Sequence, residues 1–124
     1  MAEADKAYRL MVFNVLTHNK DDHAKNFAFL RLPTGWVLSP AYDLTFSTGL
    51  NNHHTTDIAG SGNPNLADLE RVAQDCGIKR WREIIDQVCV ASAQWETIAQ
   101  RRGVSVAQTK QIGTEIEKIR RRIL

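Results

Sequence analysis

The spacing of apolar residues near the start of the chain predicts a helix over residues 4–17. Apolar side chains recur there at the i, i+3, i+4, i+7 and i+8 positions that share one helical face. The residues on this face are Tyr8, Met11, Val12, Val15 and Leu16. Leu10 and Phe13 lie off that face, so we expect the helix to be buried on more than one side. The sequence therefore predicts that a partner, or a further part of the protein, covers this helix.

The next pattern predicts a β-hairpin. Residues 18–25 are polar and indicate a loop, whereas residues 26–31 are rich in Phe and Leu and favour a strand. Residues 33–35, with the sequence Pro-Thr-Gly, are typical of a turn. A second strand is expected over residues 36–39, and Pro40 ends it.

A long polar loop is expected over residues 45–65, which are rich in Thr, Ser, Gly, Asn and His. One short strand is expected near residues 54–59. A connection of this length is more often functional or mobile than structural.

Helical patterns fill the remainder of the chain. Asn65 is expected to cap a helix that Gly77 ends, with an apolar face of Leu66, Leu69, Val72 and Cys76. A single longer helix is expected over residues 79–101, with an apolar face of Trp81, Ile84, Ile85, Val88, Trp95 and Ile98. Trp81 and Trp95 are 14 positions apart, close to four helical turns, so we expect them to share the buried face.

The last helix is expected to follow Gly103, with Ser105 as its cap. Its apolar stripe consists of Ile112, Ile116, Ile119 and Ile123. Gly113 inside the stripe weakens the helical pattern. The patterns together predict a mainly helical α+β fold with one β-hairpin, in a single domain over residues 1–124.

Composition narrows the class of protein. The chain has 124 residues, 43% hydrophobic and 24% charged, as expected for one globular domain. A net charge of +2 does not by itself indicate a nucleic-acid partner. No apolar run reaches the roughly 20 residues of a membrane span, and the first residues contain no signal-peptide core. We expect a cytoplasmic protein in which Cys76 and Cys89 are reduced, buried thiols.

Three polar residues around the predicted hairpin form a candidate site. Asp21 and Asn26 are five positions apart in the loop before the hairpin, and Asp43 follows it. A hairpin returns its end close to its start, so Asp43 is expected to approach Asn26. Phosphoryl transfer from a nucleotide uses such a set, because one carboxylate lies near the attacking hydroxyl while an amide oxygen and a second carboxylate hold Mg²⁺.

The segments "DDHAKNF" and "LSPAYDL" closely resemble the C-terminal lobe of HipA-type toxin kinases, the serine/threonine kinases of bacterial toxin–antitoxin pairs. The resemblance extends from about Tyr8 to the C-terminus. It implies that Asp21 is the catalytic base and that Asn26 and Asp43 bind Mg²⁺. We assign His23 and Lys25 supporting roles, in ordering the loop and contacting phosphate. The implied cofactors are Mg²⁺ and ATP, and the implied substrate is a Ser/Thr hydroxyl of a protein.

The nucleotide-binding lobe of such kinases has no counterpart in this sequence. There is no Gly-rich loop after a strand, and the first helix begins within a few residues of Met1. We therefore expect the chain to need an ATP-binding lobe from another chain and to be inactive alone. Possible partners are that lobe, a second copy of this chain and a helix-turn-helix DNA-binding antitoxin; no membrane partner is expected.

Two other functions fit the sequence. One is a non-catalytic interaction module, a kinase remnant that binds a partner through uncovered helices. The other is a metal-dependent hydrolase that uses Asp21, Asp22 and His23 with His53 or His54. Asp22 is otherwise expected to cap the loop. The basic residues of the helical part are expected to face solvent, with contact to nucleic acid as the alternative.

Overall fold

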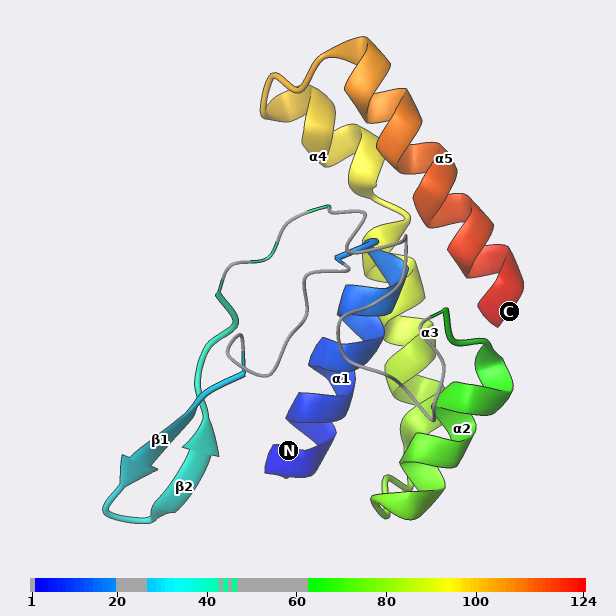
Figure 1. Ribbon diagram of the computed structural model, residues 1–124. Helices are drawn as coiled ribbons and strands as arrows, with labels where there is room; N and C mark the ends of the chain where they lie inside the picture. Colours follow the sequence, from blue (N-terminus) through cyan, green and yellow to red (C-terminus); the bar gives the residue numbers. More distant parts are fainter. Residues whose placement is uncertain (1, 20–26, 43, 45, 47–62) are drawn as a thin grey trace.

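The structure is a computed structural model that describes residues 2–19, 27–42, 44, 46 and 63–124. It contains five helices and one two-stranded sheet among these residues (Figure 1). The helices are α1 (Glu3–Leu16), α2 (Leu66–Asp75), α3 (Trp81–Ser92), α4 (Trp95–Arg101) and α5 (Val106–Ile123). The strands are β1 (Phe29–Leu32) and β2 (Gly35–Leu38). The predicted α+β composition is confirmed, while the expected strand near 54–59 lies outside the described residues.

Helix α1 is the centre of the packing. It lies beside α3 (Figure 1). It also contacts α5 and β2. Val12, Val15 and Leu16 are completely buried, in one cluster with apolar side chains of α2, α3 and α5. The prediction that α1 is buried on more than one side is thus correct. The prediction that a partner or a further part of the protein covers α1 needs correction, because α3 and α5 of the same chain supply most of its cover.

A buried hydrogen bond joins α1 to α2. The Tyr8 hydroxyl donates to the carbonyl oxygen of Leu69 at 2.8 Å. Burial, together with the nearby Glu70 carboxylate, raises the pKa of Tyr8 well above its ordinary value. The phenol therefore stays neutral and keeps its proton for this bond across the physiological pH range.

Local capping sets the ends of several helices. At the start of α2, the Asp68 amide donates to the Asn65 side chain and the Asn65 amide donates to the Asp68 carboxylate, which completes a capping box. Helices α2 and α4 end where Gly77 and Gly103 take left-handed conformations, with φ of 69° and 76°. In both cases amides beyond the helix bond back to its last-turn carbonyls, the pattern of a Schellman motif.

The expected single helix over residues 79–101 is wrong. The chain forms α3 and α4, separated at Ala93 and Gln94, where the Gln94 amide donates to the Ala91 carbonyl in a tighter turn. Trp95 therefore does not share a face with Trp81. Its indole N–H donates to the Thr109 carbonyl of α5 at 3.0 Å.

Gly113 of α5 lies next to this indole. A Cβ atom at position 113 would lie 3.4 Å from Cδ1 of Trp95. That distance is an ordinary van der Waals contact, so the ring that holds α4 on α5 packs beside Gly113 without requiring a glycine there. Ser105 caps α5 as expected, by accepting from the Gln108 amide.

The expectation that both cysteines are buried is wrong for Cys76 and confirmed for Cys89. Cys76 is exposed, because it follows the last turn of α2 while the buried residues of that helix are Leu69 and Ala73. Cys89 is buried, and burial raises the pKa of its thiol. The hairpin is also not part of the core: every residue of β1 is exposed, and Trp36 on β2 is 64% exposed.

No helix in the described part of the chain is long and apolar enough to cross a membrane.

We predict that Tyr8→Phe lowers the free energy of unfolding by about 1 kcal/mol, the ordinary loss for one buried hydrogen bond. The wild type should also lose stability more steeply than the variant as pH rises above about 10, where tyrosines in the unfolded chain ionise. The sign follows from the raised pKa: the fold favours neutral Tyr8, so its contribution is complete below that pH and declines above it. Urea unfolding at several pH values measures both effects. Identical pH profiles for the two proteins would contradict the prediction.

Candidate functional site

The residues predicted to carry chemistry lie outside the described part of the chain. This holds for the proposed catalytic and metal-binding residues, for the supporting residues and for the histidines of the hydrolase hypothesis. They are Asp21, Asp22, His23, Lys25, Asn26, Asp43, His53 and His54. The site is therefore built here from the described residues that flank these positions.

The polar segment begins at an unusual helix end. His18 has φ of 58° and is the one non-glycine residue with positive φ among the described residues. The Asn19 amide donates to the Asn14 carbonyl at 2.9 Å, and the His18 amide donates to the Val15 carbonyl at 3.4 Å. These bonds form the same motif that glycine completes in α2 and α4. A left-handed conformation costs an L-residue roughly 1–2 kcal/mol, so His18 holds a strained backbone at this point.

Buried polar side chains surround this helix end. Asn14 and Asn19 are both buried, and the Asn19 amide group donates to Oδ1 of Asn14 at 3.1 Å. Oδ1 of Asn19 has no hydrogen-bond partner among the described residues, although Asn19 is only 2% exposed. Polar groups in such positions need partners, so this cluster constrains how the chain leaves α1.

The His18 ring joins two parts of the chain that are distant in sequence. It is 5% exposed and stacks on the Phe46 ring, with 4.7 Å between the ring centroids and 24° between the planes. His18 lies three positions before Asp21, and Phe46 lies three positions after Asp43. His18, which precedes Asp21, is thus in contact with Phe46, which follows Asp43.

The hairpin brings together a second pair of flanking residues. Its strands pair from Phe29 with Leu38 to Leu32 with Gly35. Beyond them, the Ser39 amide donates to the Ala28 carbonyl at 2.7 Å. The expectation that a hairpin returns its end to its start is therefore met at residues 28 and 39.

The hairpin is also tied to the start of α1. The Glu3 carboxylate accepts from the Leu38 amide at 2.6 Å. This bond, followed by the one from Lys6, lowers the pKa of Glu3. Both segments that flank the candidate site are thus attached to α1, one at each end of the helix.

One family model matches the chain. It describes the HipA-like C-terminal domain, and the match covers residues 1–96. The chain belongs to the HipA-like C-terminal domain family. No curated protein matches it.

The matched region has a definite place in the fold. It includes α1, the hairpin, α2 and α3, and it ends at the second residue of α4. The resemblance to HipA-type kinases had been expected to continue to the C-terminus. Most of α4 and all of α5 instead lie beyond the matched part of this HipA-like chain.

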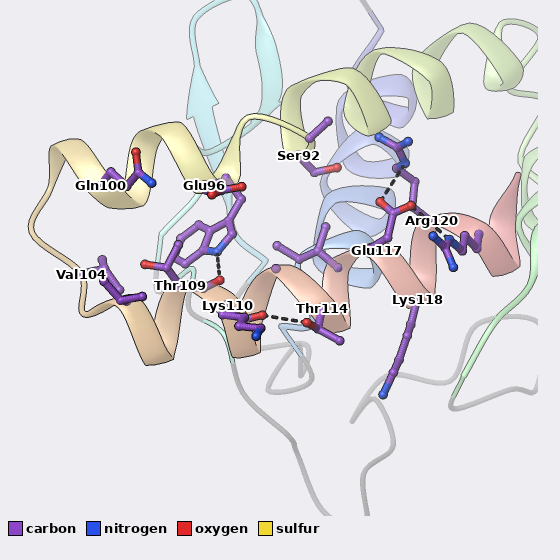
Figure 2. A pocket seen from close by; sticks show the side chains of 16 residues that line it. Ser92, Glu96, Gln100, Val104, Thr109, Lys110, Thr114, Glu117, Lys118 and Arg120 are labelled. Carbon is purple, nitrogen blue, oxygen red and sulfur yellow. Dashed lines mark hydrogen bonds and ion pairs between the residues drawn. The ribbon is translucent and has the colours of Figure 1, made fainter.

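A hollow lies between α4 and α5. It has a volume of about 800 Å³, and Figure 2 shows side chains of both helices around it. Its lining includes Trp95, Thr109 and Lys110, together with Glu117, which pairs with Arg120 and Arg121. The sequence pattern did not predict this hollow, because it exists only where α4 folds back on α5.

A second hollow of about 570 Å³ lies between α1, α3 and the segment after β2. Apolar side chains dominate it, among them Leu10, Phe13 and Val88. Nowhere in the described ranges do three His, Cys, Asp or Glu side chains gather in a way that could hold a metal ion.

We predict that Asn14→Ala destabilises the protein by about 2 kcal/mol, because it leaves the buried amide group of Asn19 without its acceptor. Gln74→Ala is the control, since it removes an exposed side-chain hydrogen bond on α2 and should change stability by less than about 0.5 kcal/mol. Chemical denaturation measures both. Equal effects of the two substitutions would contradict the prediction.

Proposed function

We propose that this HipA-like domain takes part in transfer of the γ-phosphate of ATP to a Ser or Thr hydroxyl of a protein. The observation that carries the proposal is the family match, combined with the order and spacing of Asp21, Asn26 and Asp43 within the matched residues. Four residues separate Asp21 from Asn26, as in the catalytic loop of protein kinases, and a second metal-binding Asp follows there too.

Each residue has a proposed role. Asp21 lies near the attacking hydroxyl and accepts its proton. Asn26 and Asp43 offer an amide oxygen and a carboxylate, the hard oxygen ligands that suit Mg²⁺, which neutralises phosphate charge when bound. Lys25 contacts a phosphate group, and His23 orders the loop.

The flanking contacts support this arrangement. His18 and Phe46 are stacked, and three peptide units reach at most about 11 Å. Asp21 and Asp43 are each three positions from one of these two rings. The covalent chain therefore allows the Asp21 and Asp43 carboxylates to lie in one site.

We further propose that the nucleotide-binding lobe comes from outside residues 1–124. The printed sequence contains no G-x-G-x-x-G segment. The exposed apolar side chains of the hairpin offer a surface for such a lobe; they are Phe29, Leu30, Leu32 and Trp36. By resemblance to HipA-type kinases, a helix-turn-helix antitoxin and a cytoplasmic setting belong to the same proposal.

The same hairpin favours a second candidate, a non-catalytic interaction module. A two-stranded hairpin is marginal alone in water, and exposed apolar groups on it suit a partner protein. The two candidates differ in metal binding, which the kinase needs and the module does not.

We predict that the purified chain binds Mn²⁺, used as a paramagnetic substitute for Mg²⁺, and that Asn26→Ala or Asp43→Ala weakens this binding at least about 10-fold. Asp22→Ala is the matched control and should leave the affinity within about twofold, because its proposed role is loop capping. Water-proton relaxation measures the affinity. The kinase proposal fails if the chain binds no Mn²⁺, or if it prefers Zn²⁺ in a way that depends on His53 and His54.

We also predict that the isolated chain transfers no phosphate from radiolabelled ATP to protein, because the nucleotide contacts are absent. Transfer should begin when an ATP-binding lobe is supplied on a second chain, and Asp21→Ala should then abolish it. Transfer by the isolated chain that depends on Asp21 would overturn the requirement for a second lobe while leaving the assignment of the base intact.

A further inference from the structure

Helix α4 lies outside the main core of the described residues. The core cluster of buried side chains contains no residue of α4, and Ala99 is the one buried residue of that helix. Its contacts are chiefly with α5, to which the Trp95 indole donates its hydrogen bond. A helix of seven residues is too short to be stable alone in water, so α4 depends on what packs against it.

The hollow between α4 and α5 follows one face of α5. The lining residues of that helix recur at steps of three or four positions, which places them on one side of it. They include Val106, Lys110, Thr114, Lys118 and Arg121. At 1.5 Å per residue, this face is roughly 22 Å long. Glu96 and Gln100 of α4 lie across from it (Figure 2). The hollow is therefore elongated, and its length suits about four turns of a helix better than a compact small molecule.

Apolar side chains are available along the hollow. Ile116 is buried and Trp95 is half-buried, while Val106 is 86% exposed. Val104 lines the same end as Val106. Further burial of such groups is favourable, so the hollow can bind an apolar stripe on a partner.

The charged side chains of the lining favour an acidic partner. Two of them are acidic and four are cationic. The cations are Lys110, Lys118, Arg120 and Arg121. Of the two acids, Glu117 pairs with Arg120 and Arg121, and Glu96 lies on the α4 side. Lys118 also pairs with Glu115, but an exposed pair of this kind contributes little. The net charge around the hollow is therefore positive and complements carboxylates.

We propose that the hollow between α4 and α5 is the docking site for an acidic amphipathic helix of a partner protein. The apolar face of this helix packs on Trp95, Ile116 and Val106, and its carboxylates lie near Lys110 and Lys118. The added helix also covers α4. Most of the site lies beyond the residues of the family match, and the inference does not depend on the proposed phosphoryl transfer.

The α5 helix of a second copy of this chain is a poorer occupant. It carries the same cations and ends in Arg120, Arg121 and Arg122, so it would bring positive charge to a positive surface. Like charges brought together at an interface oppose binding.

The test uses the full chain and a synthetic, fluorescein-labelled peptide of about 18 residues, which is long enough to form a helix when bound. The peptide carries leucines on one helical face and glutamates on the other. Fluorescence polarisation should show saturable binding with a Kd of about 1–10 µM. A peptide with lysine in place of every glutamate is the control and should bind at least about 10-fold more weakly.

Variants of the chain separate this site from general attraction between charges. Lys110→Glu combined with Lys118→Glu should weaken binding at least about 10-fold. Arg101→Glu combined with Arg102→Glu reverses two exposed charges outside the lining and should change the affinity by no more than about twofold. Thr114→Phe places a ring in the hollow without changing the charge and should weaken binding about 10-fold by steric exclusion.

Three results would overturn the proposal. They are the absence of saturable binding below about 100 µM, equal binding of the two peptides, and unchanged binding in Thr114→Phe. Self-association of the chain on size-exclusion chromatography that Thr114→Phe abolishes would also overturn it, because a second copy would then be the occupant.

Discussion

The burial of α1 is the constraint on which the rest of the structure depends. Its apolar residues occupy more than one face, so the helix is stable only with neighbours on several sides. Helices α3 and α5 supply two of these neighbours, and the Tyr8 hydroxyl adds a directional bond to α2. The Glu3 carboxylate attaches the hairpin to the first turn of the same helix. Helices α2, α3 and α5 and the hairpin are therefore placed by their contacts with α1, whereas α4 is held on α5.

Backbone strain and buried polar side chains occur together at the end of α1. The motif that closes α2 and α4 with glycine closes α1 with a histidine, and two buried asparagines lie beside it. Strained backbone persists only where surrounding contacts hold it, and such positions often lie at functional sites. Among the described residues, the His18 ring stacks on Phe46 and has its Nε2 3.8 Å from the Glu115 carboxylate of α5. The strained residue lies directly before the segment that contains Asp21 and Asn26.

This arrangement gives the HipA-like domain two distinct surfaces. One is the apolar, exposed hairpin, which contributes little to the core and suits a partner. The other is the junction of α1, Phe46 and α5, where the proposed metal and catalytic residues begin and end. Strand β2 of the hairpin leads along the chain to Asp43. A partner lobe that binds the hairpin would therefore bind the element that also supports the proposed site.

The sequence by itself determined the features that depend on near neighbours in the chain. The capping box of Asn65 and Asp68, the cap at Ser105 and the glycine stops were predictable because each needs only residues a few positions apart. The motif residues Asp21, Asn26 and Asp43 were identified because phosphoryl-transfer chemistry requires their order and spacing. The family was recognised on the same residues.

Tertiary structure decided what depends on distant residues. Apolar periodicity continues through residues 93–94, so only the packing of Trp95 on α5 reveals that the helix breaks there. The cover of α1, the exposure of Cys76 and the exposure of the hairpin were likewise set by neighbours far away in sequence. His18 meets residues 28 and 97 positions further along the chain. No local sequence pattern predicts such contacts. The free energy that stabilises them comes from burial against the whole core and not from neighbouring residues in the sequence.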